Sequence, residues 1–164
     1  MRMEIERKFI ADKNFVEGFI KALEIPGNKI KQFYTKVGRF EERYREQDGI
    51  YYHTIKMATQ SNLVRNEDEV RCSKEEYDRC FNKKIGNVVE KTRYKIGADE
   101  YVYEFDIYSG DLEGLCICEI EFESEKKANA FKATNLFVRE VTDDPRYKNQ
   151  SLAVNGLPEE QPSV

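Results

Sequence analysis

Tryptophan is absent from this sequence of 164 residues, histidine occurs once, and cysteine occurs four times. A single histidine leaves no cysteine and histidine cluster of the kind that zinc prefers. Cys116 and Cys118 stand two apart in a strand-like run, where about 6 to 7 Å separates their Cα atoms, near or beyond the usual limit for a disulfide. We therefore expect four reduced, buried thiols.

Long apolar runs and an excess of one charge are also missing. No segment approaches the roughly 18 apolar residues that span a bilayer, and the charged opening Met1–Lys8 does not resemble a signal peptide. Lysine and arginine number 27 against 31 aspartates and glutamates, a net charge of −4 that gives no dominant basic face. We therefore expect a cytoplasmic protein without a nucleic-acid or membrane partner.

The length fits one domain, because a second independent core would leave each half near the size at which folding alone becomes marginal. Hydrophobic residues make up 40% of the chain and charged residues 35%, which indicates a globular protein rich in charge. We expect a single domain over residues 1–157 and a disordered tail over residues 158–164.

Alternation of apolar and polar residues, the period of a β-strand, recurs in eight segments. These segments are Met3–Phe9, Ile30–Val37, Phe40–Glu46, Tyr51–Met57, Leu63–Cys72, Val88–Ile96, Glu100–Tyr108 and Leu115–Glu123. Turn residues such as Gln47–Gly49 and Gly97 separate neighbouring segments. The pattern predicts antiparallel strands, with a short extra strand over Phe137–Val141.

Capping residues predict three helices. The helices are expected between Asp12 and Pro26, from Ser73 to Phe81, and from Ser124 to about Ala133. The fold class is therefore α+β.

Charged residues form pairs of one sign on one face of the predicted strands, and the opposite faces are largely apolar. The pairs are Glu4/Glu6, Arg43/Arg45, Glu67/Glu69, Lys91/Arg93, Glu104/Asp106 and Glu119/Glu121, and Lys8 and Lys56 add to the basic set. A solvated sheet face is the simplest explanation of any one pair. Six pairs favour a ligand, because like neighbours repel each other and solubility does not require them.

Eight strands are about enough to close a barrel that holds one small ligand. Here the charges would face the interior, and helices or a partner surface would cover the apolar exterior. Two carboxylates ~4 Å apart repel by about 4 kcal/mol at an effective dielectric near 20, so a crowded acidic wall would take up protons or bind metal. A triphosphate with Mg²⁺ or Mn²⁺ would satisfy the basic and the acidic strands together.

The segment Glu4-Ile5-Glu6-Arg7-Lys8 resembles the E-x-E-x-K signature of the CYTH domain, the family of triphosphate tunnel metalloenzymes. Further matches follow in order over residues 1–153: Gln32-Phe33-Tyr34, Arg43-Tyr44-Arg45, Thr54-Ile55-Lys56, Arg65 with Glu67 and Glu69, Lys91-Thr92-Arg93, Glu104-Phe105-Asp106, and Glu119-Ile120-Glu121. The stretch from Arg139 to Ala153 is similar to the tail of short bacterial members that hydrolyse inorganic tripolyphosphate.

The resemblance implies an eight-stranded antiparallel β-barrel, a tunnel with a charged interior and helices packed outside. It implies that Mg²⁺ or Mn²⁺ is required, and it assigns roles to individual residues. Phosphate would be bound by Lys8, Arg43, Arg45, Lys56, Lys91 and Arg93; metal would be bound by Glu4, Glu6, Glu119, Glu121 and Asp106; Lys91 and Tyr34 would be catalytic. For Glu67, Glu69, Glu104 and Asp106, charge balance inside the tunnel is an equal alternative to metal ligation.

The leading function is metal-dependent hydrolysis of inorganic tripolyphosphate. The alternatives are a class IV adenylate cyclase and a non-catalytic module that binds polyphosphate or nucleotide. Met57 and the loop 58–62 depart from the family pattern and leave the substrate open, while the lack of tryptophan argues against thiamine triphosphate. No G-x-S-x-G nucleophile elbow or P-loop is present, and His53 lies on an apolar strand face. Relatives often pair, so the expected assembly is a homodimer.

Overall fold

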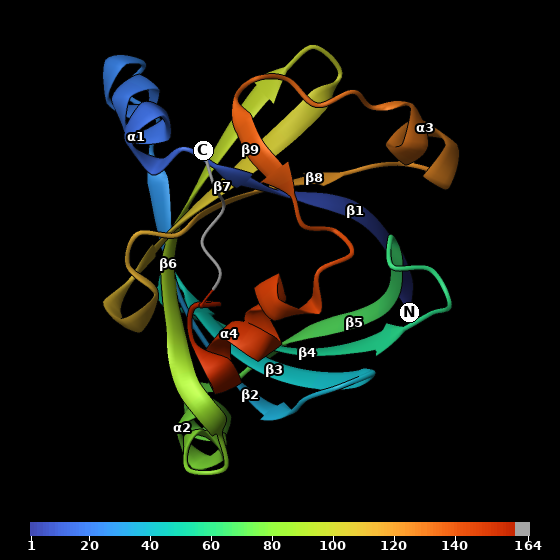
Figure 1. Cartoon of the computed structure of the whole chain (residues 1–164). Helices are drawn as coiled ribbons and strands as arrows, with labels where there is room; N and C mark the ends of the chain where they lie inside the picture. Colours follow the sequence, from blue (N-terminus) through green and yellow to red (C-terminus); the bar gives the residue numbers. More distant parts are fainter. Residues whose placement is uncertain (160–164) are drawn as a thin grey trace.

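Eight strands close into an antiparallel barrel in the computed structural model, which describes residues 1–159 (Figure 1). The strands are β1 (Arg2–Ala11), β2 (Gly27–Lys36), β3 (Phe40–Gln47), β4 (Ile50–Ala58), β5 (Val64–Cys72), β6 (Ile85–Ala98), β7 (Tyr101–Ser109) and β8 (Cys116–Glu121). Their order is β5-β4-β3-β2-β6-β7-β8-β1, and pairing of β1 with β5 completes the ring. The predicted eight-stranded barrel is confirmed.

The extra strand predicted near residue 137 is also present. It is β9 (Phe137–Glu140), which pairs with the second half of β1 outside the ring. Arg7 joins the two strands, because its Nε and Nη2 donate to the two carboxylate oxygens of Glu140 at 2.8 and 2.7 Å.

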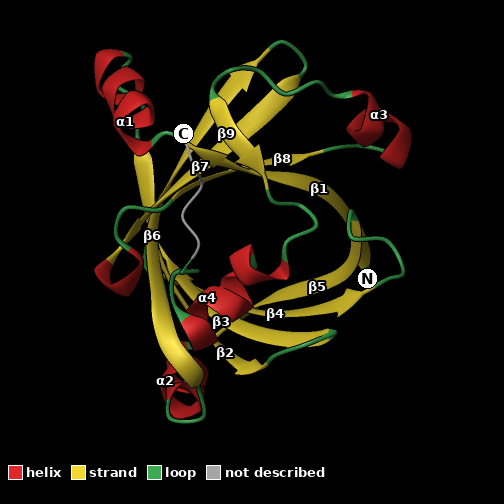
Figure 2. Ribbon diagram, in the orientation of Figure 1, coloured by secondary structure: helices red, strands yellow, loops and turns green. Residues whose placement is uncertain are grey.

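Three helices lie outside the barrel, as the capping residues predicted (Figure 2). They are α1 (Lys13–Ala22), α2 (Lys74–Phe81) and α3 (Glu125–Ala130). The side chains of Asp12, Ser73 and Ser124 each accept a hydrogen bond from a backbone N–H of the first turn. Helix α3 ends earlier than predicted, because Phe131 is extended and its ring packs 5.7 Å from that of Phe122.

Two turns differ from the sequence prediction. Strand β6 continues through Gly97 to Ala98, and the turn falls at Asp99, which has a positive φ of 57°. Strand β2 begins at Gly27, which was expected only to stop a helix. A Cβ at Gly27 would lie 2.5 Å from the Tyr94 ring, so the close pairing of β2 with β6 requires glycine there.

A fourth helix, α4 (Asn149–Asn155), was not predicted and lies across one opening of the barrel (Figure 1). It packs against β6 and β2. Gln150 donates to and accepts from the backbone of Gly38 at 3.1 and 2.6 Å, and Asn149 accepts from the Tyr108 hydroxyl at 2.6 Å. The preceding segment forms a short 3₁₀ helix over Pro145–Tyr147, and a second one covers Gly110–Leu112.

The apolar faces of the strands form the core outside the lumen, where the helices cover them. One cluster includes Phe9, Phe105 and Ile120 on the side of α1 and α3, and another joins Phe33 and Tyr77 beneath α2. Among the described residues no helix has both the length and the apolar character needed to traverse a bilayer. Most of the tail predicted to be disordered, residues 160–164, lies outside the described residues.

Candidate active site in the barrel lumen

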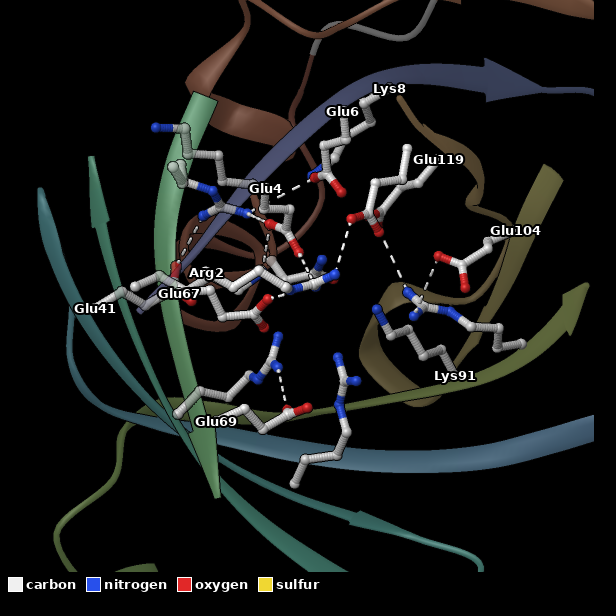
Figure 3. A pocket seen from close by; sticks show the side chains of 18 of the residues that line it. Arg2, Glu4, Glu6, Lys8, Glu41, Glu67, Glu69, Lys91, Glu104 and Glu119 are labelled. Carbon is white, nitrogen blue, oxygen red and sulfur yellow. Dashed lines mark hydrogen bonds and ion pairs between the residues drawn. The ribbon is translucent and has the colours of Figure 1, made fainter. Parts of the chain in front are cut away.

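The barrel encloses a cavity of about 240 Å³ with an almost entirely charged lining, which we call the lumen (Figure 3). Ten lysine or arginine side chains and eight glutamates line it, and Tyr34 and Asn149 are its uncharged side chains. Every predicted site residue except Asp106 reaches the lumen. The structure thus brings the basic and the acidic strands to one enclosed space.

The basic wall is built by β2 and β3. Arg45 Nε donates to Gln32 Oε1 at 3.0 Å, and Gln32 Nε2 donates to the Tyr34 hydroxyl at 2.8 Å. Burial, together with Arg43 and Arg93, lowers the pKa of Arg45 to about 10. Burial raises the pKa of Tyr34, so its phenol is neutral at physiological pH. Cations crowded in this way are stabilised by an anion between them.

Asp106 on β7 positions the two basic side chains of β6. Lys91 Nζ donates to Asp106 Oδ2 at 2.8 Å, and Arg93 Nε and Nη2 donate to its two oxygens at 2.7 and 2.8 Å. Asp106 is fully buried behind these side chains. Burial, assisted by Arg93 and opposed by Asp106, lowers the pKa of Lys91 to about 8. Lys91 therefore loses its proton in the mildly alkaline range.

The acidic wall joins β1 to β8, where Glu6 pairs in register with Glu121. Burial and the neighbouring Glu119 and Glu4 raise the pKa of Glu6 to about 8. Burial opposes ionisation of Glu119 as well, but Lys8 and other cations hold its pKa well below the ordinary range, and a hydrogen bond from Glu6 adds to the effect. These carboxylates are crowded enough for one to retain a proton.

Arg65 on β5 links the acidic wall to β3. Its Nη2 lies 3.7 Å from a carboxylate oxygen of Glu4 and 3.7 Å from one of Glu6, and its Nη1 lies 3.4 Å from Glu41. Lys56 Nζ donates to Glu4 at 3.1 Å. Burial opposes the ionisation of Glu4, yet Lys56 and Arg65 lower its pKa to about 2.

The three glutamates with an open role each face a cation. The pairs are Glu67 with Arg2 (2.8 Å), Glu69 with Arg43 (3.4 Å), and Glu104 with Lys95 (3.3 Å). In the arrangement described for residues 1–159, no three histidine, cysteine, aspartate or glutamate side chains converge closely enough to hold a metal ion.

Comparison with known proteins identifies the chain's relatives. No family model matches it. An inorganic triphosphatase of Nitrosomonas europaea is 36% identical over 153 residues, which cover 93% of this chain and 97% of that protein. An inorganic triphosphatase of Acetivibrio thermocellus is 33% identical over 156 residues, 94% of this chain and 96% of that protein. The chain belongs to the CYTH family of triphosphate tunnel metalloenzymes.

Solved structures agree with this family. The crystal structure of the inorganic triphosphatase NE1496 is 33% identical with a TM-score of 0.65, covering 94% of this chain and 96% of that one. The PH1012 protein of Pyrococcus horikoshii is 18% identical with a TM-score of 0.61 over 98% and 96% of the two chains. At that identity it shows the shared fold alone.

Two groups that the sequence set aside lie outside the lumen of this CYTH protein. His53 stacks on Tyr44 at 4.7 Å, and its Nε2 lies 2.9 Å from Glu42 on the outer face of the barrel. All four cysteines are free, three of them buried, while Cys72 is partly exposed.

The sequence analysis gave no role to several residues that line the lumen of this CYTH protein. Arg2, Glu41 and Arg65 have the same strand parity as the predicted site residues beside them, so alternation alone could have identified them. Lys148 and Asn149 come from the start of α4 instead. No strand period extends to that segment, and only the fold brings it to the lumen.

Proposed function

We propose that this protein hydrolyses inorganic tripolyphosphate and that it requires Mg²⁺ or Mn²⁺ held in the lumen. The observation that carries the proposal is the lining: ten cations and eight carboxylates face one enclosed space, with a single aromatic side chain, Tyr34. A nucleotide or thiamine substrate would need an aromatic or apolar wall for its ring. The names of the two curated relatives support the same substrate.

The carboxylates of the acidic wall suit a hard divalent cation, because Mg²⁺ and Mn²⁺ prefer oxygen ligands. Glu4, Glu6, Glu119 and Glu121 would hold it. Glu6 carries a proton that a cation would displace, which would relieve the repulsion between these groups. Since no three carboxylates converge in the described arrangement, side chains of this wall must move when metal binds. The bound metal would withdraw charge from phosphoryl oxygens and activate a water molecule.

The basic residues would bind and orient the substrate. Lys8, Arg43, Arg45, Lys56, Lys91 and Arg93 would contact phosphoryl oxygens through charge-assisted hydrogen bonds. Asp106 accepts from both Lys91 and Arg93, so we assign it the positioning of these two cations in place of metal ligation. Glu67, Glu69 and Glu104, each facing a cation, would balance charge.

Lys91 and Tyr34 would take part in the reaction itself. With a pKa of about 8, Lys91 is mostly protonated at neutral pH and could give a proton to the bridging oxygen as the anhydride bond breaks. The Tyr34 hydroxyl accepts from Gln32 and keeps its own hydrogen for a phosphoryl oxygen.

The test is an assay of phosphate release from tripolyphosphate, ATP and thiamine triphosphate, each with Mg²⁺, with Mn²⁺ and with EDTA. We expect release to be fastest from tripolyphosphate and to be abolished by EDTA. Chromatography of the ATP reaction for cyclic AMP tests the cyclase alternative. No release from any substrate, with tripolyphosphate still bound, would leave the non-catalytic binding module in its place.

A further inference from the structure

A second cavity, of about 90 Å³, opens beside the lumen, and we call it the side chamber. Five residues line both spaces: Glu4, Glu6, Lys8, Arg65 and Lys148. Three of these, Glu4, Glu6 and Lys8, project from β1 in Figure 3. Because these side chains line both cavities, they can contact a ligand in either one.

The side chamber exists because β1 changes partners along its length. Its pairing with β5 ends at Ile5, and its pairing with β9 begins at Phe9. The gap is flanked by two segments without regular structure, residues 59–63 and 141–144, which include the loop that departs from the family pattern. Asn62 Nδ2 donates to Asp143 Oδ1 at 3.1 Å and joins the two segments at the surface.

Four cations surround the side chamber: Lys8, Arg39, Arg65 and Lys148. The Lys148 ammonium has no hydrogen bond or ion pair with any of residues 1–159. Burial, with Arg65, Lys8 and Arg39 nearby, lowers its pKa. Arg39 donates from Nη2 to the Thr59 carbonyl at 3.2 Å, which leaves its other donors free of protein partners in the described part of the chain.

The carboxylates of the side chamber do not neutralise Lys148. Three carboxylates line the side chamber: Glu4 is already held by Lys56 and Arg65, Glu6 lies 3.7 Å from Arg65, and Asp144 pairs with Arg146 at 2.7 Å. Lys148 is partly buried and Lys8 is buried, and their mutual repulsion lowers the stability of the fold unless an anion lies between them. The side chamber therefore has the charge of an anion site.

We propose that the side chamber binds the orthophosphate that leaves the lumen, with Arg39 and Lys148 as its own ligands and Lys8 and Arg65 as shared ones. The source of this ion rests on the proposed function. In that reaction the water oxygen stays with orthophosphate, the bridging oxygen stays with pyrophosphate, and the proton released goes to pyrophosphate or solvent. The cavity has several times the volume that one water requires, which is room for one tetrahedral oxyanion and too little for a triphosphate.

The test compares Arg39→Ala and Lys148→Ala with Lys126→Ala, which removes an exposed lysine from α3 and so makes the same change in net charge. Arg39 is the cleaner probe, because it lines the side chamber and not the lumen. We expect the inhibition constant of orthophosphate to rise about tenfold in both variants, the loss of one charge-assisted hydrogen bond. The KM for tripolyphosphate should change less than threefold in Arg39→Ala, and Lys126→Ala should match the wild type.

Binding without turnover separates this proposal from the proposed function. A calorimetric titration of the wild-type protein with orthophosphate should show binding at one site. The affinity of this site should be lower in Arg39→Ala even if no substrate is hydrolysed. If orthophosphate binds equally to all four proteins, or to none, the proposal is overturned. Tetrapolyphosphate tests whether the end of a longer substrate, and not free orthophosphate, occupies the side chamber. A raised KM for tetrapolyphosphate in Arg39→Ala, with orthophosphate binding unchanged, would show that the chamber binds the end of the substrate chain, and would overturn the proposed product site.

Discussion

At the scale of single residues, the lumen is organised by ion pairs that position cations for a substrate. Asp106 shows this most clearly, because it is fully buried and accepts from both Lys91 and Arg93. Breaking such a buried pair from one side leaves an uncompensated charge and is expensive. Lys91 and Arg93 are therefore held in place before a substrate arrives.

Lys91→Ala should reduce kcat for tripolyphosphate by about a hundredfold or more while KM rises much less, because a proton donor acts chiefly in the transition state. Steady-state kinetics measures both constants. Lys126→Ala is the matched control, since Lys126 is an exposed lysine on α3 that does not line the lumen. Equal losses of kcat and affinity in Lys91→Ala would favour simple binding over catalysis.

Arg7 belongs to the signature segment, yet its side chain points away from the lumen and binds Glu140 of β9 outside the barrel. Its hydrogen bonds lower the pKa of Glu140, against the effect of burial. A carboxylate with a lowered pKa contributes stability above its unfolded pKa, and that stability is lost as the pH falls through the folded pKa.

When the pH falls from 6 to 3.5, the melting temperature of Glu140→Gln should therefore decrease less than that of the wild type. The pair is partly exposed, so we expect a difference of about 1 to 3 °C. Calorimetry at several pH values measures it. Glu125→Gln, an exposed glutamate at the start of α3, should follow the wild type, and equal slopes for all three proteins would contradict the assignment.

At the scale of elements, α4 is attached through a backbone contact that only glycine permits. Gly86, in β6, has a φ of +74°, and a Cβ there would lie 2.3 Å from the Ala153 carbonyl oxygen. Gly86→Ala should destabilise the protein by about 1 to 3 kcal/mol and loosen α4. Urea unfolding measures the change in the free energy of unfolding.

Gly18→Ala is the opposite case, because a Cβ at this position in α1 meets open space. It should stabilise the protein by about 0.5 to 1 kcal/mol through helix propensity. A loss of stability in Gly18→Ala, or none in Gly86→Ala, would show that the packing of these helices differs from the structure.

Strand alternation predicted the barrel well, because every strand must separate an apolar face from a charged one. The residues of β1, β3, β6 and β8 that reach the lumen follow directly from that parity. Helix α4 escaped prediction because Lys148 at its N-terminus makes no side-chain capping hydrogen bond, whereas the shorter α3 is marked by the Ser124 cap. Asp106 has the strand parity of the lumen-facing residues, but Lys91 and Arg93 lie between its side chain and the lumen. A sequence pattern does not indicate which of several neighbouring side chains is nearest to the cavity.

At the scale of the whole molecule, the lumen concentrates charges of both signs. A ligand that pairs with these charges should stabilise the folded protein. Tripolyphosphate with Mg²⁺ at about a hundred times its Kd should stabilise the folded state by about 2.7 kcal/mol, a rise in melting temperature of about 5 to 10 °C. Thermal denaturation with and without ligand measures this. The shift should shrink as salt screens the charges, and a salt-independent shift would contradict electrostatic binding.

The expected homodimer stays a prediction at this scale. Exposed apolar side chains are distributed over several elements, among them Phe15 in α1, Leu23 at its C-terminal cap and Val102 on β7. Light scattering at several protein concentrations would determine the oligomeric state.

Strand β1 precedes all the other described strands in the chain, and yet it pairs with β5, β8 and β9. Its backbone hydrogen bonds to these partners cannot all form until most of the polypeptide has been synthesised. The residues proposed to bind metal and phosphate can therefore come together only after β8, which ends at Glu121, has been synthesised. A chain that ended before β8 would leave this edge of β1 unpaired, and an unpaired strand edge favours aggregation.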